Sequence, residues 1–208
     1  EVFSTALNKM AYRGPDAKGI EIIGNNYFGH VRLSIVDLEN TSNQPIQDDR
    51  NLMIFNGEIY NYKELDPVSS SDTKRLFNCI QEMDAPFKKI KGMYAFGWFE
   101  KSTGRMTFYR DFFGEKPLYY FNDADVCIVS STLKSIKVIL QNLNKKAELN
   151  RKAITTDFML FGYIREPETI YNEIKTLSPG HILSVDNKNV ITVKPNKFHL
   201  EKESYVWT

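Results

Sequence analysis

Residues 93–99 read MYAFGWF, a stretch in which every residue except Gly97 has a hydrophobic side chain. A strand with one face in water alternates hydrophobic and polar residues, whereas a strand buried on both faces is hydrophobic throughout. Residues 126–129 (VCIV) repeat this pattern. Both segments therefore predict strands that are covered on both sides, as in layered sheets with outer helices.

Working outward from these two segments, the hydrophobic periodicity predicts a mixed chain of strands and helices. We expect further strands at 20–23, 27–36, 52–55, 106–109, 118–121, 181–185 and 190–193, the last two joined by a hairpin turn at 186–189. We expect an opening helix that ends near Gly14-Pro15, helices at 73–83 and 131–143, and another that begins at Asn150 as its cap.

The composition is that of an ordinary globular protein. The 208 residues carry 27 basic and 26 acidic side chains, and 42% are hydrophobic. This balance excludes a mainly disordered chain and argues against nucleic acid as a partner, because a strong basic surface is missing. No hydrophobic run approaches the ~18 residues that a membrane span needs, and no basic signal-peptide start precedes one.

The two cysteines and three histidines are too far apart in sequence to suggest a zinc site or a disulfide framework. We therefore expect a reducing compartment, the cytoplasm. The chain also opens within an amphipathic helix that no capping residue precedes. This opening predicts that the natural protein has an amino-terminal segment before Glu1.

Residues 30–35 (HVRLSI) place His30, Arg32 and Ser34 on one face of a strand by their alternation. By itself this row is typical of the solvent-facing side of a sheet. The functional alternative is an arginine that binds a substrate carboxylate.

Two further motifs also have a structural and a functional interpretation. Asn56-Gly57 is a strong hairpin-turn signal, but a side-chain amide next to an unobstructed backbone N–H also suits an oxyanion hole. Asp72 precedes a helix as a cap would, or it could receive a substrate ammonium group. Residues 13–16 (RGPD) alone indicate only a helix-ending turn.

The order of these motifs decides between the interpretations. Taken together they resemble the class II glutamine amidotransferase domain of glutamine-dependent asparagine synthetases, over nearly the whole chain. The resemblance rests on residues 13–16 (RGPD), 30–37 (HVRLSIVD), 44–45 (QP), 56–61 (NGEIYN), 71–73 (SDT), 92–96 (GMYAF), 110–111 (RD), 114–120 (GEKPLYY), 167–171 (PETIY) and 177–181 (LSPGH).

The resemblance implies an α+β fold, the four-layer αββα sandwich of amino-terminal-nucleophile hydrolases, with two mostly antiparallel sheets and outer helices. It implies hydrolysis of L-glutamine to glutamate and ammonia. In the family an amino-terminal cysteine attacks the side-chain amide through a thioester intermediate, with its own α-amino group as the base.

The resemblance also assigns roles to individual residues. The Asn56 side chain and the Gly57 N–H would form the oxyanion hole, and Arg32 would bind the glutamine carboxylate. Asp72 and Glu58 would surround the ammonium group. Backbone groups would complete the pocket at Leu33, Ser34, Ile35 and Val36.

The chain departs from the family pattern in several places. The nucleophilic cysteine is missing, and we interpret Cys79 and Cys127 as small core residues. Tyr12 stands where the family usually has histidine, and Glu115 replaces an apolar residue. The segment between Leu65 and Asp72 is much shorter than its family counterpart, which predicts missing residues there.

We therefore expect residues 1–194 to form a glutaminase domain and residues 195–208 a linker toward a synthetase domain. That domain, absent from this chain, would use ATP and Mg to amidate a carboxylate, most simply that of aspartate, and the family allows a homodimer. The glutaminase domain itself needs no cofactor. The alternative is an inactive glutamine-binding or structural module that truly lacks the nucleophile.

Overall fold

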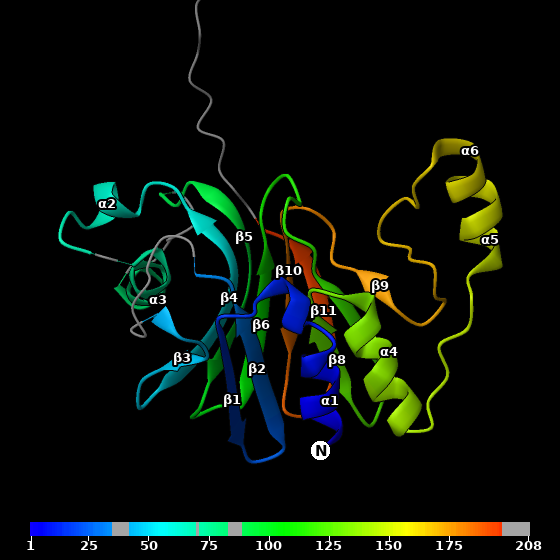
Figure 1. The fold of residues 1–208 in the computed structure, drawn as a ribbon, viewed down its shortest axis with the longest axis horizontal. Helices are drawn as coiled ribbons and strands as arrows, with labels where there is room; N and C mark the ends of the chain where they lie inside the picture. Colours follow the sequence, from blue (N-terminus) through cyan, green and yellow to red (C-terminus); the bar gives the residue numbers. More distant parts are fainter. Residues whose placement is uncertain (35–41, 70, 83–88, 197–208) are drawn as a thin grey trace, which may run out of the picture.

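The computed structural model describes residues 1–34, 42–69, 71–82 and 89–196. These residues form four layers, with two β layers stacked face to face and helices outside each of them (Figure 1). The predicted αββα sandwich is therefore confirmed.

The first β layer is a six-stranded sheet whose described pairings are all antiparallel, in the order β11-β10-β6-β5-β4-β3. Its strands are β3 (Ile46–Gln47), β4 (Asn51–Ile59), β5 (Gly92–Glu100), β6 (Arg105–Arg110), β10 (His181–Val185) and β11 (Ile191–Pro195). Along β5, Tyr94, Phe96 and Trp98 belong to one core cluster, whereas Ala95 and Phe99 belong to cores on the opposite face. The central strand is thus buried on both sides, as its sequence predicts.

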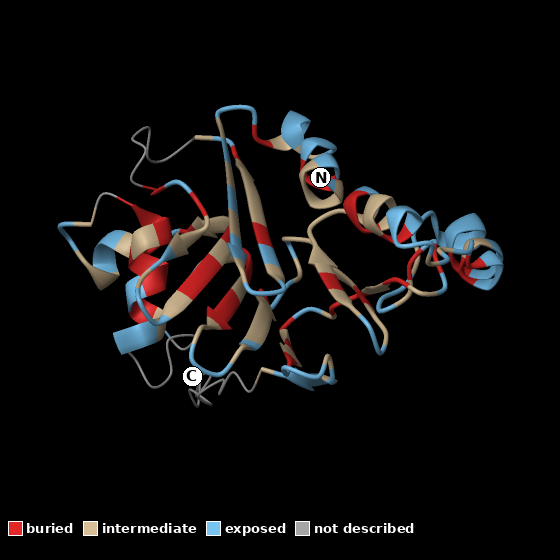
Figure 2. Cartoon of the chain, turned by 90° about the horizontal axis from the view of Figure 1, so that it is seen from below, coloured by how far each residue is buried: buried red, intermediate tan, exposed pale blue. Residues whose placement is uncertain are grey.

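Helix α3 (Asp72–Glu82) covers the outer face of this sheet, beside the single turn α2 (Tyr62–Leu65). Its Leu76 and Phe77 pack against the β4 and β5 side chains of the same face, including Phe55 and Trp98. Figure 2 shows buried residues concentrated where α3 meets these strands.

The second β layer consists of two separate pieces. One is the hairpin β1 (Ala17–Ile23) and β2 (Asn26–Arg32), and the other is the three-stranded sheet β8-β7-β9. The latter contains β7 (Tyr119–Asn122), β8 (Cys127–Ser130) and β9 (Lys175–Thr176). Within the described residues, β2 and β8 each pair with another strand along one edge only, apart from an isolated bridge between Pro15 and Arg32.

Helices α1 (Val2–Asn8) and α4 (Leu133–Asn142) pack on each other and cover this second layer. The short helix η1 (Ala11–Arg13) follows α1. Farther along, α5 (Arg151–Ala153), the π-helical turn η4 (Ile154–Phe158) and α6 (Met159–Phe161) project from the body with mostly exposed residues (Figure 2).

Most of the predicted elements occur within a few residues of their expected bounds. Asn150 caps α5 as predicted, since its Oδ1 accepts the Ala153 N–H at 3.0 Å. The turn at 186–189 joins β10 and β11, with the Asp186 N–H donating to the Val190 carbonyl. Strand 27–36 was predicted too long, because β2 ends at Arg32, where the chain leaves the ladder.

No helix among the described residues is long and apolar enough to cross a membrane.

Candidate active site

A cavity of about 620 Å³ lies between the two pieces of the second β layer. Residues of β2 and β8 line it from the sides, α1 and α4 line it from outside, and β4, β5 and β6 form its floor. The lining is mostly apolar, and it includes Phe28, Ile54, Phe108 and Ile128. An extended, mainly hydrophobic cavity that is partly open therefore lies within the sandwich.

Asn56 contributes a polar group to this cavity. It lies on the same face of β4 as Leu52 and Ile54, because side chains alternate along a strand. Its amide nitrogen Nδ2 is buried and finds no hydrogen-bond partner among the described residues. A buried donor without a partner costs about 1–3 kcal/mol, so this atom is poised for an acceptor on a bound molecule.

Gly57 follows within the same strand, at φ +154°. A Cβ at this position would come within 2.1 Å of the Met93 carbonyl oxygen, so no larger residue fits. Asn56 and Gly57 pair with Ala95 and Tyr94 in the middle of the β4–β5 ladder. The hairpin-turn interpretation of Asn56-Gly57 is therefore wrong.

Arg32 ends β2 with a side chain that is only 8% exposed. Its Nη1 donates to the Asn43 Oδ1 at 2.9 Å. The RGPD motif packs against this strand end, since the Asp16 N–H donates to the Arg32 carbonyl and a Cβ on Gly14 would overlap the Val31 backbone. The motif that alone predicts only a turn thus positions the candidate carboxylate-binding arginine.

His30 lies on the same face of β2 as Arg32 and the buried Phe28. Burial lowers the pKa of His30 to about 4, although a hydrogen bond to the Phe55 backbone opposes the shift. The Arg32 charge lowers this pKa further. This face of β2 looks inward, so the solvent-facing interpretation of the row is wrong.

Asp72 begins α3 and is 7% exposed. Its Oδ2 accepts the Ile59 N–H of β4 at 3.2 Å, and its Oδ1 accepts the Thr73 N–H. Burial raises the pKa of Asp72 above its ordinary value, although these hydrogen bonds oppose the rise. Ser71 supplies the helix cap, because its Oγ accepts the Lys74 N–H. Asp72 is thereby fixed beside the end of β4 that carries Glu58.

The backbone assigned to the pocket at residues 33–36 is described only in part. Leu33 is exposed, and the Ser34 N–H donates to the Asp16 Oδ2 at 2.7 Å. Ile35 and Val36 lie outside the described residues. Between Leu65 and Asp72 the chain turns at Asp66, whose carbonyl accepts the Ser69 N–H, and residue 70 lies outside the described part.

Cys127 lines the cavity that contains Asn56, but neither cysteine carries a reactive thiol. Cys79 is fully buried in α3, and burial raises the pKa of its thiol. Cys127 lies on β8 among hydrophobic residues, where burial raises its thiol pKa to about 12. Because the thiolate is the reactive form, both thiols are poor nucleophiles at neutral pH.

Two contacts support the candidate site, although the sequence alone assigned no role to the residues that make them. The Gln44 Oε1 accepts the Phe55 N–H next to Asn56, and Arg13 donates to Ser131 Oγ at 2.8 Å, joining η1 to the residue after β8. Residues 13–16 and 44–45 contribute to the family resemblance only through their place in the order of the motifs. Among the described residues no group of three His, Cys, Asp or Glu side chains could hold a metal ion.

Comparison with known proteins places this geometry in a family. The model of the glutamine amidotransferase domain matches residues 1–198. The chain is 35% identical to a putative glutamine-hydrolyzing asparagine synthetase 2 of Methanocaldococcus jannaschii, over 89% of this chain and 42% of that protein. It is 33% identical to the glutamine-hydrolyzing asparagine synthetase 1 of Bacillus subtilis, over 90% of this chain and 31% of that protein.

Two solved structures share the fold. The glutamine phosphoribosylpyrophosphate amidotransferase of B. subtilis superposes with a TM-score of 0.63 at 18% identity, covering 93% of this chain and 46% of that chain. A second structure, that of the allosteric regulatory enzyme of purine biosynthesis, gives a TM-score of 0.59 at 20% identity, covering 86% and 36%. The present chain spans less than half the length of these relatives. It belongs to the glutamine amidotransferase domain family.

Proposed function

We propose that this domain hydrolyses L-glutamine to glutamate and ammonia, and that the ammonia serves the amidation of a carboxylate. The observation that carries the proposal is Asn56 Nδ2, a buried donor that has no partner in the described part of the chain. It lies at the cavity, next to a glycine where no side chain fits. Together with the Gly57 N–H, this donor suits the oxyanion that forms when an amide carbon is attacked.

Three charged side chains, none of them among the residues that line the cavity, suit the two ends of free glutamine. Arg32, buried and oriented by Asn43, can bind the α-carboxylate through its guanidinium group. Asp72 and Glu58 can receive the α-ammonium group, which favours the ionised carboxylate at Asp72 despite its burial. Backbone from Leu33 to Val36 would close the pocket, as in the family.

The nucleophile in this proposal is a cysteine that precedes Glu1 in the natural protein. The cavity extends from Glu1 and Asn26 at one end of β2 to His30, Val31 and Asn56 toward the other. Six extended residues, the number from Asn26 to Val31, cover about 17–20 Å. A strand of this length, running between the single-paired strands β2 and β8, would carry its first residue toward Asn56.

The cysteine thiolate would attack the side-chain amide carbon, and ammonia would leave with a proton from the cysteine α-amino group. The resulting thioester is hydrolysed by water to glutamate. Ammonia set free in water at neutral pH would be protonated, so a sheltered path to an acceptor is needed. We propose an ATP- and Mg-dependent synthetase domain as the recipient and aspartate as its substrate, in the cytoplasm.

A mass-spectrometric labelling experiment separates this function from the alternative of an inactive module. The natural full-length protein is incubated with a glutamine analogue that carries an electrophilic side chain, and glutamate release is measured in parallel. We expect glutamate release and one modified cysteine that precedes Glu1. The Cys127→Ser variant should behave like the wild type. A folded full-length protein with neither activity nor label would establish the inactive module.

A further inference from the structure

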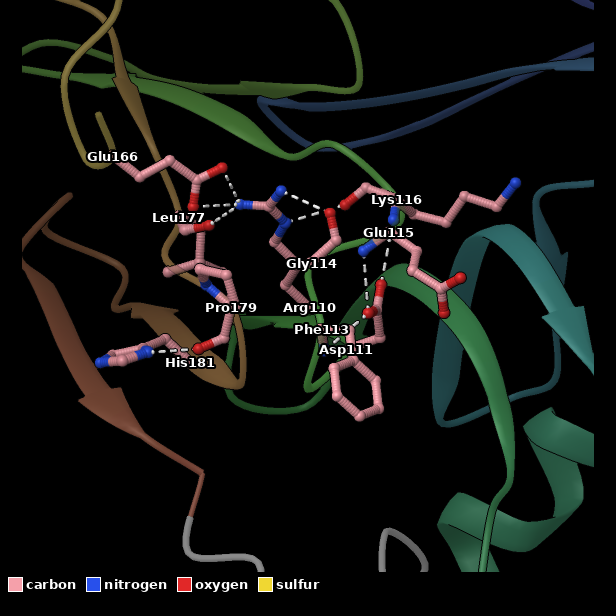
Figure 3. Close-up of polar contacts among 10 residues, drawn as sticks. All are labelled: Arg110, Asp111, Phe113, Gly114, Glu115, Lys116, Glu166, Leu177, Pro179 and His181. Carbon is pink, nitrogen blue, oxygen red and sulfur yellow. Dashed lines mark hydrogen bonds and ion pairs between the residues drawn. The ribbon is translucent and has the colours of Figure 1, made fainter. Parts of the chain in front are cut away.

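A buried arginine joins two exposed hydrophobic elements of the molecule. Arg110, at the end of β6, is 5% exposed and lies 2.9 Å from both carboxylate oxygens of Glu166 (Figure 3). It also donates to the carbonyls of Gly114, Lys116 and Leu177. Arg110 therefore ties the loop that follows β6 to the segment that follows α6.

The loop after β6 is held in one conformation by its own aspartate. Asp111 is 2% exposed, and its carboxylate accepts the N–H groups of Phe113, Glu115 and Lys116 (Figure 3). The same carboxylate accepts the Tyr94 N–H of β5. Despite this rigid support, Phe112 and Phe113 are 51% and 80% exposed, with their rings edge to face. A fixed loop thus presents two aromatic rings to the surroundings.

The segment at α6 presents a second hydrophobic group. Phe158, Met159, Leu160, Phe161 and Tyr163 are all more than half exposed. Figure 1 places α6 and the loop after β6 on the same edge of the molecule. We call the residues 112–113 and 158–163 together the aromatic edge. Each of the two groups exposes apolar side chains that follow one another in the chain, and exposed apolar patches often mark an interaction site.

The last described residue lies next to the loop of this edge. The Gly180 N–H donates to the Asp111 carbonyl at 2.8 Å, and the Asn196 N–H donates to the Gly180 carbonyl at 2.8 Å. Asn196 therefore lies beside the loop that carries Phe112 and Phe113. A domain tethered at this point would have the aromatic edge within immediate reach.

We propose that the aromatic edge is the docking surface for the ATP-dependent synthetase domain. This inference rests on the proposed function. It is supported by the position of Asn196 beside this loop and by the greater length of the relatives, of which this chain covers 42% and 31%. Exposed aromatic residues on a rigid support are typical anchors of an interface, because little conformational entropy is lost when they are buried.

The test uses the full-length protein that contains the synthetase domain. Three rates are measured: glutamate release, amide product formed with glutamine, and amide product formed with added ammonia. In the Phe112→Ser, Phe113→Ser double variant we expect unchanged glutamate release and unchanged ammonia-dependent synthesis. The product formed per glutamate released should fall about fivefold or more, because the two domains no longer close on each other.

A second double variant, Phe161→Ser with Tyr163→Ser, tests the other half of the aromatic edge. If the first double variant loses glutamate release, the second one is used to judge the proposal. Val68→Ser is the control, since Val68 is 91% exposed and lies outside the surface. Product per glutamate within twofold of the wild type in both double variants would overturn the docking surface alone. A wild-type protein that releases no glutamate would instead overturn the proposed function, and the docking surface with it.

Discussion

The two faces of the six-stranded sheet are packed in different ways. On the face toward α3, the hydrophobic side chains of β4 and β5 meet those of the helix in one buried cluster that includes Phe96 and Leu76. On the opposite face, β2 and β8 stand on either side of a cavity of about 620 Å³. Side chains fill the space between the sheet and α3, whereas the described residues leave a cavity on the opposite face.

This difference suggests that one face of the sheet mainly stabilises the sandwich and that the other mainly serves its function. Close packing gains dispersion and hydrophobic free energy, so we assign most of the stability to the face toward α3. The open face contains the buried Asn56 donor, which is a cost unless something binds there, and His30, whose lowered pKa is a cost only in acid. Four predictions test this division, from the largest expected effect to the smallest.

Phe55→Ala should lower the free energy of unfolding by about 3–5 kcal/mol, because Phe55 is 3% exposed and belongs to the packed core on the face toward α3. Phe108→Ala, on the cavity side, should cost less than half as much, since Phe108 already borders open space. Urea unfolding followed by fluorescence of the buried Trp98 measures both. Equal losses would contradict the division.

Asn56→Ala should lower glutamine turnover about 10²- to 10³-fold in the protein that carries its nucleophile, with little change in KM. The donor acts mainly on charge that develops in the transition state. Steady-state glutamate release is the measurement. Asn26→Ala is the matched control, because Asn26 lines the far end of the same cavity and should leave turnover unchanged.

Arg32→Ala should raise the KM for glutamine about 10- to 100-fold, which corresponds to the ~1.5–3 kcal/mol of a charge-assisted hydrogen bond. Turnover should change less than KM. Arg50→Ala, on an exposed turn, should leave both constants unchanged. A variant of Arg32 with wild-type KM would assign the residue a structural role through Asn43.

His30 should make stability sensitive to acid. Its folded-state pKa of about 4 lies below the ordinary value of 6.5, so the unfolded chain binds the proton more tightly. Stability is therefore full above pH 6.5 and falls as the pH drops toward 4, by about 2 kcal/mol near pH 5. Melting temperatures from pH 7 to 5 should fall less in His30→Gln than in the wild type. Parallel curves would remove His30 as the cause.

Much of the fold follows from local patterns in the sequence. Residues 93–99 predict a strand buried on both faces because no position along it is suited to water, and β5 has this burial. Helix α3 and the β10–β11 hairpin also follow from periodicity and turn residues. The predicted end of a strand was wrong where strand pairing determines it. β2 is the example, since no residue between 33 and 36 signals the end of a ladder.

The sequence by itself determined the family, through the order of its motifs, and with it the candidate residues Arg32, Asn56, Gly57, Glu58 and Asp72. Only the tertiary structure excluded the local interpretations of Asn56-Gly57 and of the row of His30 and Arg32. Asn56-Gly57 favours a turn locally, but pairing with β5 holds it within a strand, and burial turns His30 and Arg32 inward. The physical reason is that ladder hydrogen bonds and burial arise between segments far apart in the chain, and their sum outweighs a local turn preference.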